Sequence, residues 1–93
     1  MALTLQTIKN RSTFVHIRSN GSFIKGKFIN LQFLEDSSLN GTIAVGFTAT
    51  KKVGNAVKRN KAKRLMREMS KKVLINYGKI NRYYVLIAKS SIF

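Results

Sequence analysis

Two side-chain periods meet in residues 42–68, and this change of period most constrains how the chain can fold. In "TIAVGFTAT", residues 42–50, every second side chain is apolar, which is the pattern of a β-strand. Gly54 then interrupts the strand pattern, and Asn55 is a favourable residue for capping a helix N-terminus. Apolar residues recur at helical spacing from Ala56 onward. The sequence therefore predicts a strand that leads, through a short turn, into a helix.

The predicted helix has an apolar face and a cationic face. At about 100° per residue, one stripe gathers Ala62, Leu65, Met66, Met69 and Val73. The nearly opposite face carries Arg59, Asn60, Lys63, Arg64, Arg67 and Lys71. We expect the apolar stripe to dock on a sheet and the cationic face to point away from it.

The positive charge of this region indicates a polyanionic partner. Residues 51–68 hold eight Lys and Arg side chains and one acid, Glu68, and the whole chain carries a net charge of +15. Like charges one turn apart destabilise a helix by about 0.2–0.5 kcal/mol per pair, so the neutralising anions must come from outside the helix. Nucleic acid is the leading partner class, ahead of a merely soluble surface or attraction to anionic lipid. No apolar run approaches the ~18–20 residues that span a bilayer, and we predict a cytoplasmic protein.

The chain is poorly equipped for catalysis of its own. It has no cysteine, one histidine (His16) and three acids, of which Glu35 and Asp36 are adjacent and Glu68 is on the basic helix. Disulfides and thiolate metal sites are therefore excluded. Hydrolysis by two metal ions normally needs clustered carboxylates. We predict no catalytic residue, no metal site and no small-molecule substrate.

Shorter patterns predict the remaining elements. Residues 10–21 read as a short helix with Ser12 as its N-cap and Asn20-Gly21 as its C-terminal turn. A strand is predicted in "KFINLQFL", residues 27–34, and a possible extra strand in "GSFIKG", residues 21–26. Asn40-Gly41 is a strong hairpin signal.

A last strand is predicted in "RYYVLIA", residues 82–88. The order is then α-β-β-β-α-β within a single domain, residues 1–93. We expect an α+β fold, a small two-layer sandwich with a mixed sheet and its helices on one face.

One side of the strand at residues 42–50 carries only small or hydroxyl side chains, namely Ala44, Gly46, Thr48 and Thr50. Such a surface admits either a ligand or a closely packed helix, and the sequence does not decide between them. Motifs that read the DNA major groove, such as a zinc site or a dimerising zipper, are not found. A sheet with aromatic and hydroxyl groups beside a basic helix better suits RNA, whose bases can stack and whose phosphates can pair.

The stretch "VGFTATKKVGNAVKRNKAKRLMRE", Val45 to Glu68, resembles the protein subunit of bacterial ribonuclease P. The matching positions are Gly46, Lys51, Lys52, Gly54, Asn55, Ala56, Val57, Arg59, Asn60, Lys63, Arg64, Arg67 and Glu68. "IKNRSTFVHIRSNG" and "YYVLIAK" are similar to the first helix and the last strand of that family. Three positions depart from its usual pattern: Lys61 replaces an arginine, and Arg18 and Leu31 stand where many members carry aromatic residues.

The resemblance implies a fold with an unusual left-handed crossover. Members usually continue past the last strand into a further helix, whereas this sequence ends at Phe93, so we expect that helix to be missing. It also implies that a catalytic RNA with bound Mg²⁺ removes the 5′ leader from precursor tRNA. The protein would bind no cofactor itself; it would bind the catalytic RNA and hold the single-stranded leader.

The resemblance also assigns residues to these two partners. Those implied to contact the catalytic RNA are Lys51, Lys52, Asn55, Arg59, Asn60, Lys61, Lys63, Arg64 and Arg67. Phe14, Arg18, Leu31 and Thr48 would line a leader cleft between the sheet and the first helix. For Leu31 a core position is favoured over the cleft, whereas Phe14 is evenly balanced between the core and the edge of the cleft.

Two other functions compete with this one. A generic RNA-binding or ribosome-associated protein could carry a similar basic helix. A nuclease with its own active site is disfavoured by the few carboxylates and the single histidine.

Overall fold

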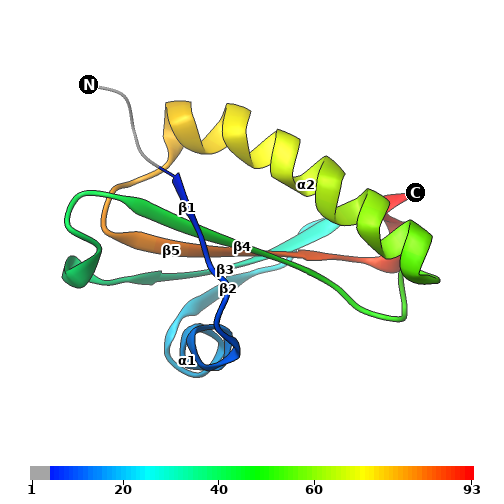
Figure 1. The fold of residues 1–93 in the computed structure, drawn as a ribbon, viewed down its shortest axis with the longest axis horizontal. Helices are drawn as coiled ribbons and strands as arrows, with labels where there is room; N and C mark the ends of the chain where they lie inside the picture. Colours follow the sequence, from blue (N-terminus) through cyan, green and yellow to red (C-terminus); the bar gives the residue numbers. More distant parts are fainter. Residues whose placement is uncertain (1–4) are drawn as a thin grey trace.

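The protein is built around one mixed sheet of five strands, seen edge-on in Figure 1. The computed structural model describes residues 5–93. Its elements are β1 (Leu5–Thr7), α1 (Arg11–Asn20), β2 (Ser22–Ile24), β3 (Ile29–Glu35), β4 (Ile43–Ala49), α2 (Ala56–Tyr77) and β5 (Arg82–Ala88), with short 3-10 helices at Ser37–Leu39 and Ser90–Ile92. The α+β class, the mixed sheet and the strand at residues 21–26 are confirmed. Strand β1 was not predicted, because three residues are too few to show a period.

The strand order is β1-β4-β5-β3-β2, which places the last strand at the centre. β1 and β5 both run parallel to β4, whereas β3 is antiparallel to β5 and to β2. The hairpin predicted at Asn40-Gly41 is therefore wrong, because β5 lies between β3 and β4. Asn40 and Gly41 do adopt the left-handed conformation expected of them, with φ of 52° and 79°. They form the exit of a 3-10 turn rather than the tip of a hairpin.

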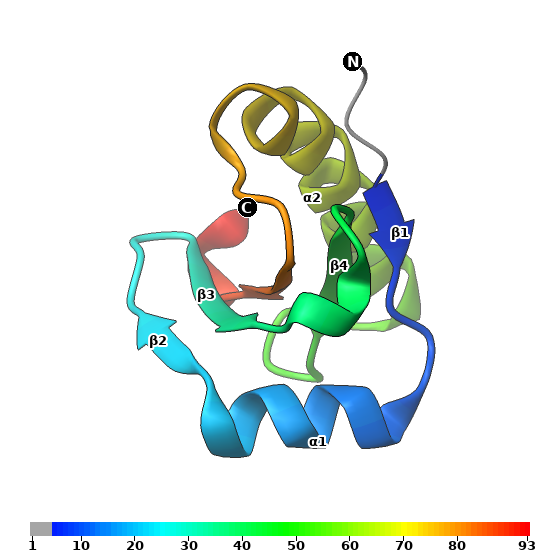
Figure 2. The same cartoon turned by 90° about the vertical axis from the view of Figure 1, so that its left-hand side faces the viewer.

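Strands β4 and β5 are adjacent and parallel, and α2 connects them. Figure 2 looks along these strands with α2 above the sheet, and the chain passes from β4 on the right to β5 on its left. This is a left-handed crossover, the sense that the resemblance implied. Only about 2% of such connections have it.

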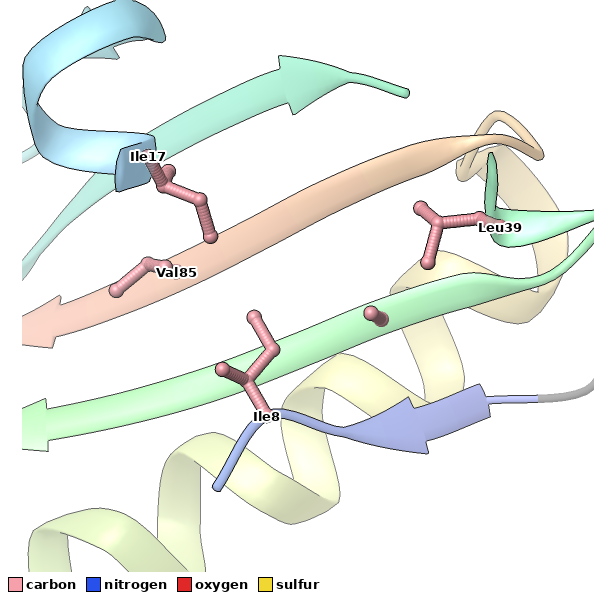
Figure 3. Close-up of a cluster of buried hydrophobic side chains, with 5 residues drawn as sticks. Ile8, Ile17, Leu39 and Val85 are labelled. Carbon is pink, nitrogen blue, oxygen red and sulfur yellow. The ribbon is translucent and has the colours of Figure 1, made fainter. Parts of the chain in front are cut away.

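The two helices cover opposite faces of the sheet, so the prediction of helices on one face is wrong (Figures 1 and 2). Neighbouring residues of β5 show the division: Tyr84 packs in a cluster with Leu74 of α2, whereas Val85 packs with Ile17 of α1. Figure 3 shows Ile17, Val85 and Ile8 converging beneath α1. Side chains on both sides of β5 are apolar in "YYVLIA", which is the pattern of a strand buried on both faces.

Helix α1 begins two residues earlier than predicted. Asn10 occupies the N-cap position without a side-chain capping hydrogen bond, and Ser12 lies inside the helix. The C-terminal turn is confirmed, since the Gly21 N–H donates to the Ile17 carbonyl at 2.7 Å.

Helix α2 begins at Ala56 and ends at Tyr77, and the predicted cap is confirmed by the Asn55 side chain accepting from the Lys58 N–H at 3.0 Å. Its buried line differs from the predicted stripe and consists of Ala62, Met66, Ser70 and Leu74. Leu65, Met69 and Val73 are 39%, 42% and 52% exposed. Buried Ser70 is tolerated because its hydroxyl donates to the Arg67 carbonyl at 2.9 Å. No helix of the described residues is long and apolar enough to cross a membrane.

Candidate nucleic-acid interface

The turn that joins β4 to α2 presents two lysines to solvent. Lys51 and Lys52 are exposed, while Val53 between them and the helix is buried and anchors the turn in the core. Gly54 has φ of 141°, a conformation that favours glycine. Asn55 is exposed, but its side-chain oxygen is used as the helix cap. The structure thus gives Asn55 a structural task, and its contact with RNA stays a prediction.

The solvent-facing side of α2 carries a line of polar and cationic residues. Asn60, Arg64, Arg67 and Lys71 are exposed and recur every three or four residues, so they share one side of the helix. Arg59 and Lys63 are half-buried on the flank of this line, and exposed Lys61 neighbours Arg64 on the other flank. The structure therefore brings the predicted helix residues together on one convex surface, which we call the α2 ridge.

Arg67 reaches from the ridge to the sheet. Its guanidinium carbon lies 5.6 Å from the centre of the Phe47 ring of β4, a cation–π contact. The contact orients the guanidinium group without engaging its N–H donors, so these donors remain available to a phosphate.

The cations of α2 have no acidic partner within residues 5–93. The helix holds eight Lys and Arg side chains, its first turn has no acid, and the ion pair of the described residues joins Arg82 to Glu35 at 2.7 Å. A helix N-terminus is already electropositive, so the basic residues there add to its field. The resulting potential attracts a polyanion and raises its association rate.

Two of the three acids lie at the far end of the sheet. Glu35 ends β3 opposite Arg82, whereas Lys51 and Lys52 follow the other end of β4. The hydrogen bond from Arg82 lowers the pKa of Glu35, and hydrogen bonds from Ser38 lower the pKa of Asp36. Both carboxylates are thus occupied in local structure, and the basic end of the sheet is left without them.

Helix α1 packs closely on the sheet where β4 has no side chain. A Cβ atom on Gly46 would lie 2.5 Å from the Phe14 ring. The small side of the strand therefore receives a helix at Gly46, which settles the alternative that the sequence left open at that position. Phe14 is half-buried and packs at the border of the core cluster beneath α1, so it forms the core's edge.

A hollow of about 680 Å³ lies on the same face of the sheet, beyond α1. It is lined by Asn30, Thr50, Lys51, Lys52, Ile87, Ala88, Lys89 and Ser90. Thr48, half-buried on β4, belongs to this face because it alternates with Phe47, which packs on the α2 side. The hollow extends from the basic turn before α2 to Ile87, which packs against the core cluster beneath α1. Lys89 was not predicted as a site residue, because it is far in the sequence from the charge-dense stretch at residues 51–68. Its position directly after the last strand is the sequence feature that could have indicated it.

The four residues predicted to line a leader cleft do not all meet. Phe14 and Thr48 share the α1 face, and Arg18 is exposed one turn after Phe14. Leu31 packs with Tyr84 and Leu74 on the α2 face. Its assignment to the cleft is wrong, and the core position favoured for it is confirmed.

The arrangement suits the binding of a polyanion. It offers a convex cationic ridge for structured phosphates and, around one end of the sheet, a concave surface with hydroxyl, amide and ammonium groups. Among residues 5–93, no three His, Asp or Glu side chains are grouped as metal ligands.

The family model described as "Ribonuclease P" matches residues 4–92. The ribonuclease P protein component of Caulobacter vibrioides is 34% identical over 87 residues, which cover 94% of this chain and 58% of the relative. That of Ruegeria pomeroyi is 55% identical over 49 residues, covering 53% of this chain and 39% of the relative. The chain thus spans about half the length of the curated relatives it matches.

Solved structures show the same fold. The Staphylococcus aureus RNase P protein superposes with a TM-score of 0.80 at 26% identity, covering 92% of this chain and 76% of that one. The RNase P protein of Thermotoga maritima gives a TM-score of 0.77 at 22% identity, covering 94% and 76%. At 22% identity, the similarity to the Thermotoga maritima protein shows only that the two chains share a fold.

Proposed function

Because the chain belongs to the ribonuclease P protein family, we propose that it is the protein subunit of a ribonuclease P holoenzyme that matures the 5′ end of tRNA in the bacterial cytoplasm. The observation that carries the proposal is the α2 ridge, whose cations have no acidic partner among the described residues. Such a surface needs a polyanion, and the family supplies a large RNA.

In this proposal the two surfaces have separate partners. The α2 ridge, with Lys51 and Lys52 before it, binds the catalytic RNA through phosphates. The hollow, together with Thr48 and Phe14 on the same face of the sheet, holds the single-stranded 5′ leader of the precursor tRNA. The two surfaces adjoin because Lys51 and Lys52 line the hollow and also lead into α2.

The cleavage chemistry belongs, in this proposal, to the RNA subunit and its bound Mg²⁺. The protein's contribution is to bind, position and neutralise charge. Two of its three acids support this division, since Glu35 pairs with Arg82 and Asp36 accepts from the Ser38 N–H at 2.9 Å. Both carboxylates are therefore already engaged in local contacts.

Substitution of the ridge tests the RNA partner. Arg64→Ala and Arg67→Ala should each weaken binding to a bacterial ribonuclease P RNA and lower the salt dependence of binding by about one phosphate contact. Lys72→Ala is the matched control, because Lys72 is also exposed on α2 but lies outside the assigned residues. Filter binding at several salt concentrations measures both quantities.

Equal affinities and equal salt slopes for the unmodified protein and the two arginine variants would contradict the assignment of the ridge. Loss of affinity in all three variants alike would favour a generic attraction to RNA over a defined interface.

A further inference from the structure

Strand β2 and the turn that joins it to β3 expose two aromatic rings among basic residues. Phe23 and Phe28 are 49% and 48% exposed. Lys25 and Lys27 are exposed between them, and the Lys27 ammonium lies 5.4 Å from the centre of the Phe28 ring. No acid occurs in residues 22–28. We call this segment the aromatic hairpin.

The aromatic hairpin is held in place by hydrogen bonds. The Gly26 N–H donates to the Asn30 side chain at 3.1 Å, and the Lys89 ammonium donates to the Gly26 carbonyl at 3.0 Å. The Ser91 hydroxyl donates to the Lys27 carbonyl at 2.8 Å. A turn fixed in this way loses little conformational entropy when it binds a ligand.

The hairpin is continuous with the hollow. Asn30 and Lys89, which hold the turn, are also lining residues of the hollow. Phe23 pairs with Gln32 across the β2–β3 ladder, and Gln32 shares a side of β3 with Asn30. Phe23 therefore lies on the α1 face, as the hollow does. Its neighbour Ile24 pairs with Leu31 and lies on the α2 face.

Exposed rings next to unpaired ammonium groups match the chemistry of single-stranded nucleic acid. Bases stack on aromatic side chains, and the phosphates between them pair with lysines. Charge complementarity selects this occupant over an apolar peptide, since the chain as a whole carries +15 and the hairpin adds only cations.

We propose that the aromatic hairpin is a contact for single-stranded RNA that extends the hollow, with Phe23 and Phe28 stacking on bases and Lys25 and Lys27 pairing with phosphates. The identity of that RNA as the distal part of the 5′ leader rests on the proposed function. Leader nucleotides that leave the hollow past Asn30 and Lys89 reach the hairpin next.

The test compares leaders of two lengths on the assembled holoenzyme. Precursor tRNAs carry a leader of about ten nucleotides, within the range that single-strand sites cover, or one of about two nucleotides. The double variant Phe23→Ala/Phe28→Ala should bind the long-leader substrate at least about tenfold more weakly and the short-leader substrate unchanged. Ile24→Ala is the control, since it shortens an exposed apolar side chain of the same strand on the other face.

Two further variants separate stacking from charge. Phe23→Trp/Phe28→Trp should retain the affinity for the long leader, because the larger ring still stacks. Lys25→Ala/Lys27→Ala should reduce the salt dependence of long-leader binding, by no more than the contribution of about two phosphate contacts. Lys79→Ala, a loss of charge at the other end of β5, should leave that slope unchanged.

A second experiment measures RNA binding by the hairpin without relying on the proposed function. The free protein is titrated with an oligouridine of about ten nucleotides, within the length range of single-strand sites. If the unmodified protein does not assemble with the catalytic RNA, but the alanine double variant binds oligouridine more weakly, the single-strand contact stands and its leader assignment falls. Equal binding of the unmodified protein and the double variant to oligouridine and to the long leader would overturn the proposal. The same two proteins are also titrated with vesicles of phosphatidylcholine and phosphatidylserine. If the double variant loses affinity for these vesicles but not for RNA, the hairpin is a lipid contact and the proposal is overturned.

Discussion

At the scale of single residues, Gly46 sets how closely α1 approaches the sheet. Gly46→Ala should destabilise the protein by about 1–3 kcal/mol, because the new Cβ would overlap the Phe14 ring at 2.5 Å. Urea unfolding followed by circular dichroism measures the change. The double variant Gly46→Ala/Phe14→Ala is the control, and its cost should be smaller than the sum of the two single costs. A Gly46→Ala protein as stable as the unmodified one would contradict the packing of α1 on β4.

Asn55 allows capping and RNA binding to be separated at one position. Asn55→Ala should cost about 1 kcal/mol of stability, because the Lys58 N–H loses its acceptor, whereas Asn55→Asp should keep the cap. If Asn55 also contacts RNA, the aspartate variant should bind the catalytic RNA more weakly at unchanged melting temperature. An aspartate variant with undiminished RNA affinity would leave Asn55 with the capping role alone.

At the scale of elements, the link between β3 and β5 gives the protein a pH dependence. The Arg82 hydrogen bond lowers the pKa of Glu35, so the ionised carboxylate stabilises the folded state at neutral pH. That stabilisation should be lost as the pH falls through the lowered pKa, below the ordinary carboxyl value of about 4.3. Glu35→Gln should therefore flatten the acid limb of stability against pH, measured by thermal melts. Glu68→Gln serves as the control, and an equal flattening by both would contradict the role of the Glu35–Arg82 pair.

The elements also show how far local sequence patterns reach. The bounds of α2 and β5 follow from local signals, namely the Asn55 cap and the Gly78 stop for the helix and the "RYYVLIA" run for the strand. The pairing of β5 joins residues 39 positions apart with β4 and 47 to 59 positions apart with β3, and no local pattern encodes it. For the same reason, both helices were predicted to lie on one face of the sheet. The side chains of β5 are nevertheless apolar on both of its sides, which indicates that both faces are covered.

The candidate site divides in the same way. The α2 ridge could be predicted because a helix fixes which residues share a face. The hollow could not, because Asn30, Lys51 and Lys89 come from three separate segments that only the strand pairing brings together. Leu31 was placed on the wrong face for lack of a known register, since a shift of one residue exchanges the faces of a strand.

At the scale of the whole molecule, the net charge of +15 should make stability depend on anions. Multivalent anions that bind the folded state should raise the melting temperature by mass action and reduce self-repulsion. Sulfate or pyrophosphate should stabilise more than sodium chloride at the same ionic strength. Equal melting temperatures at matched ionic strength would show general screening rather than bound anions.

The proposed role of this chain in the holoenzyme can be measured by single-turnover cleavage of a precursor tRNA by a bacterial ribonuclease P RNA at low Mg²⁺, with and without this protein. We expect the protein to accelerate cleavage strongly, and more for a precursor with a long leader than for one whose leader is cut back to a few nucleotides. An RNA that binds the protein tightly but cleaves no faster, whatever the leader length, would contradict the role of this chain as the protein subunit of the holoenzyme.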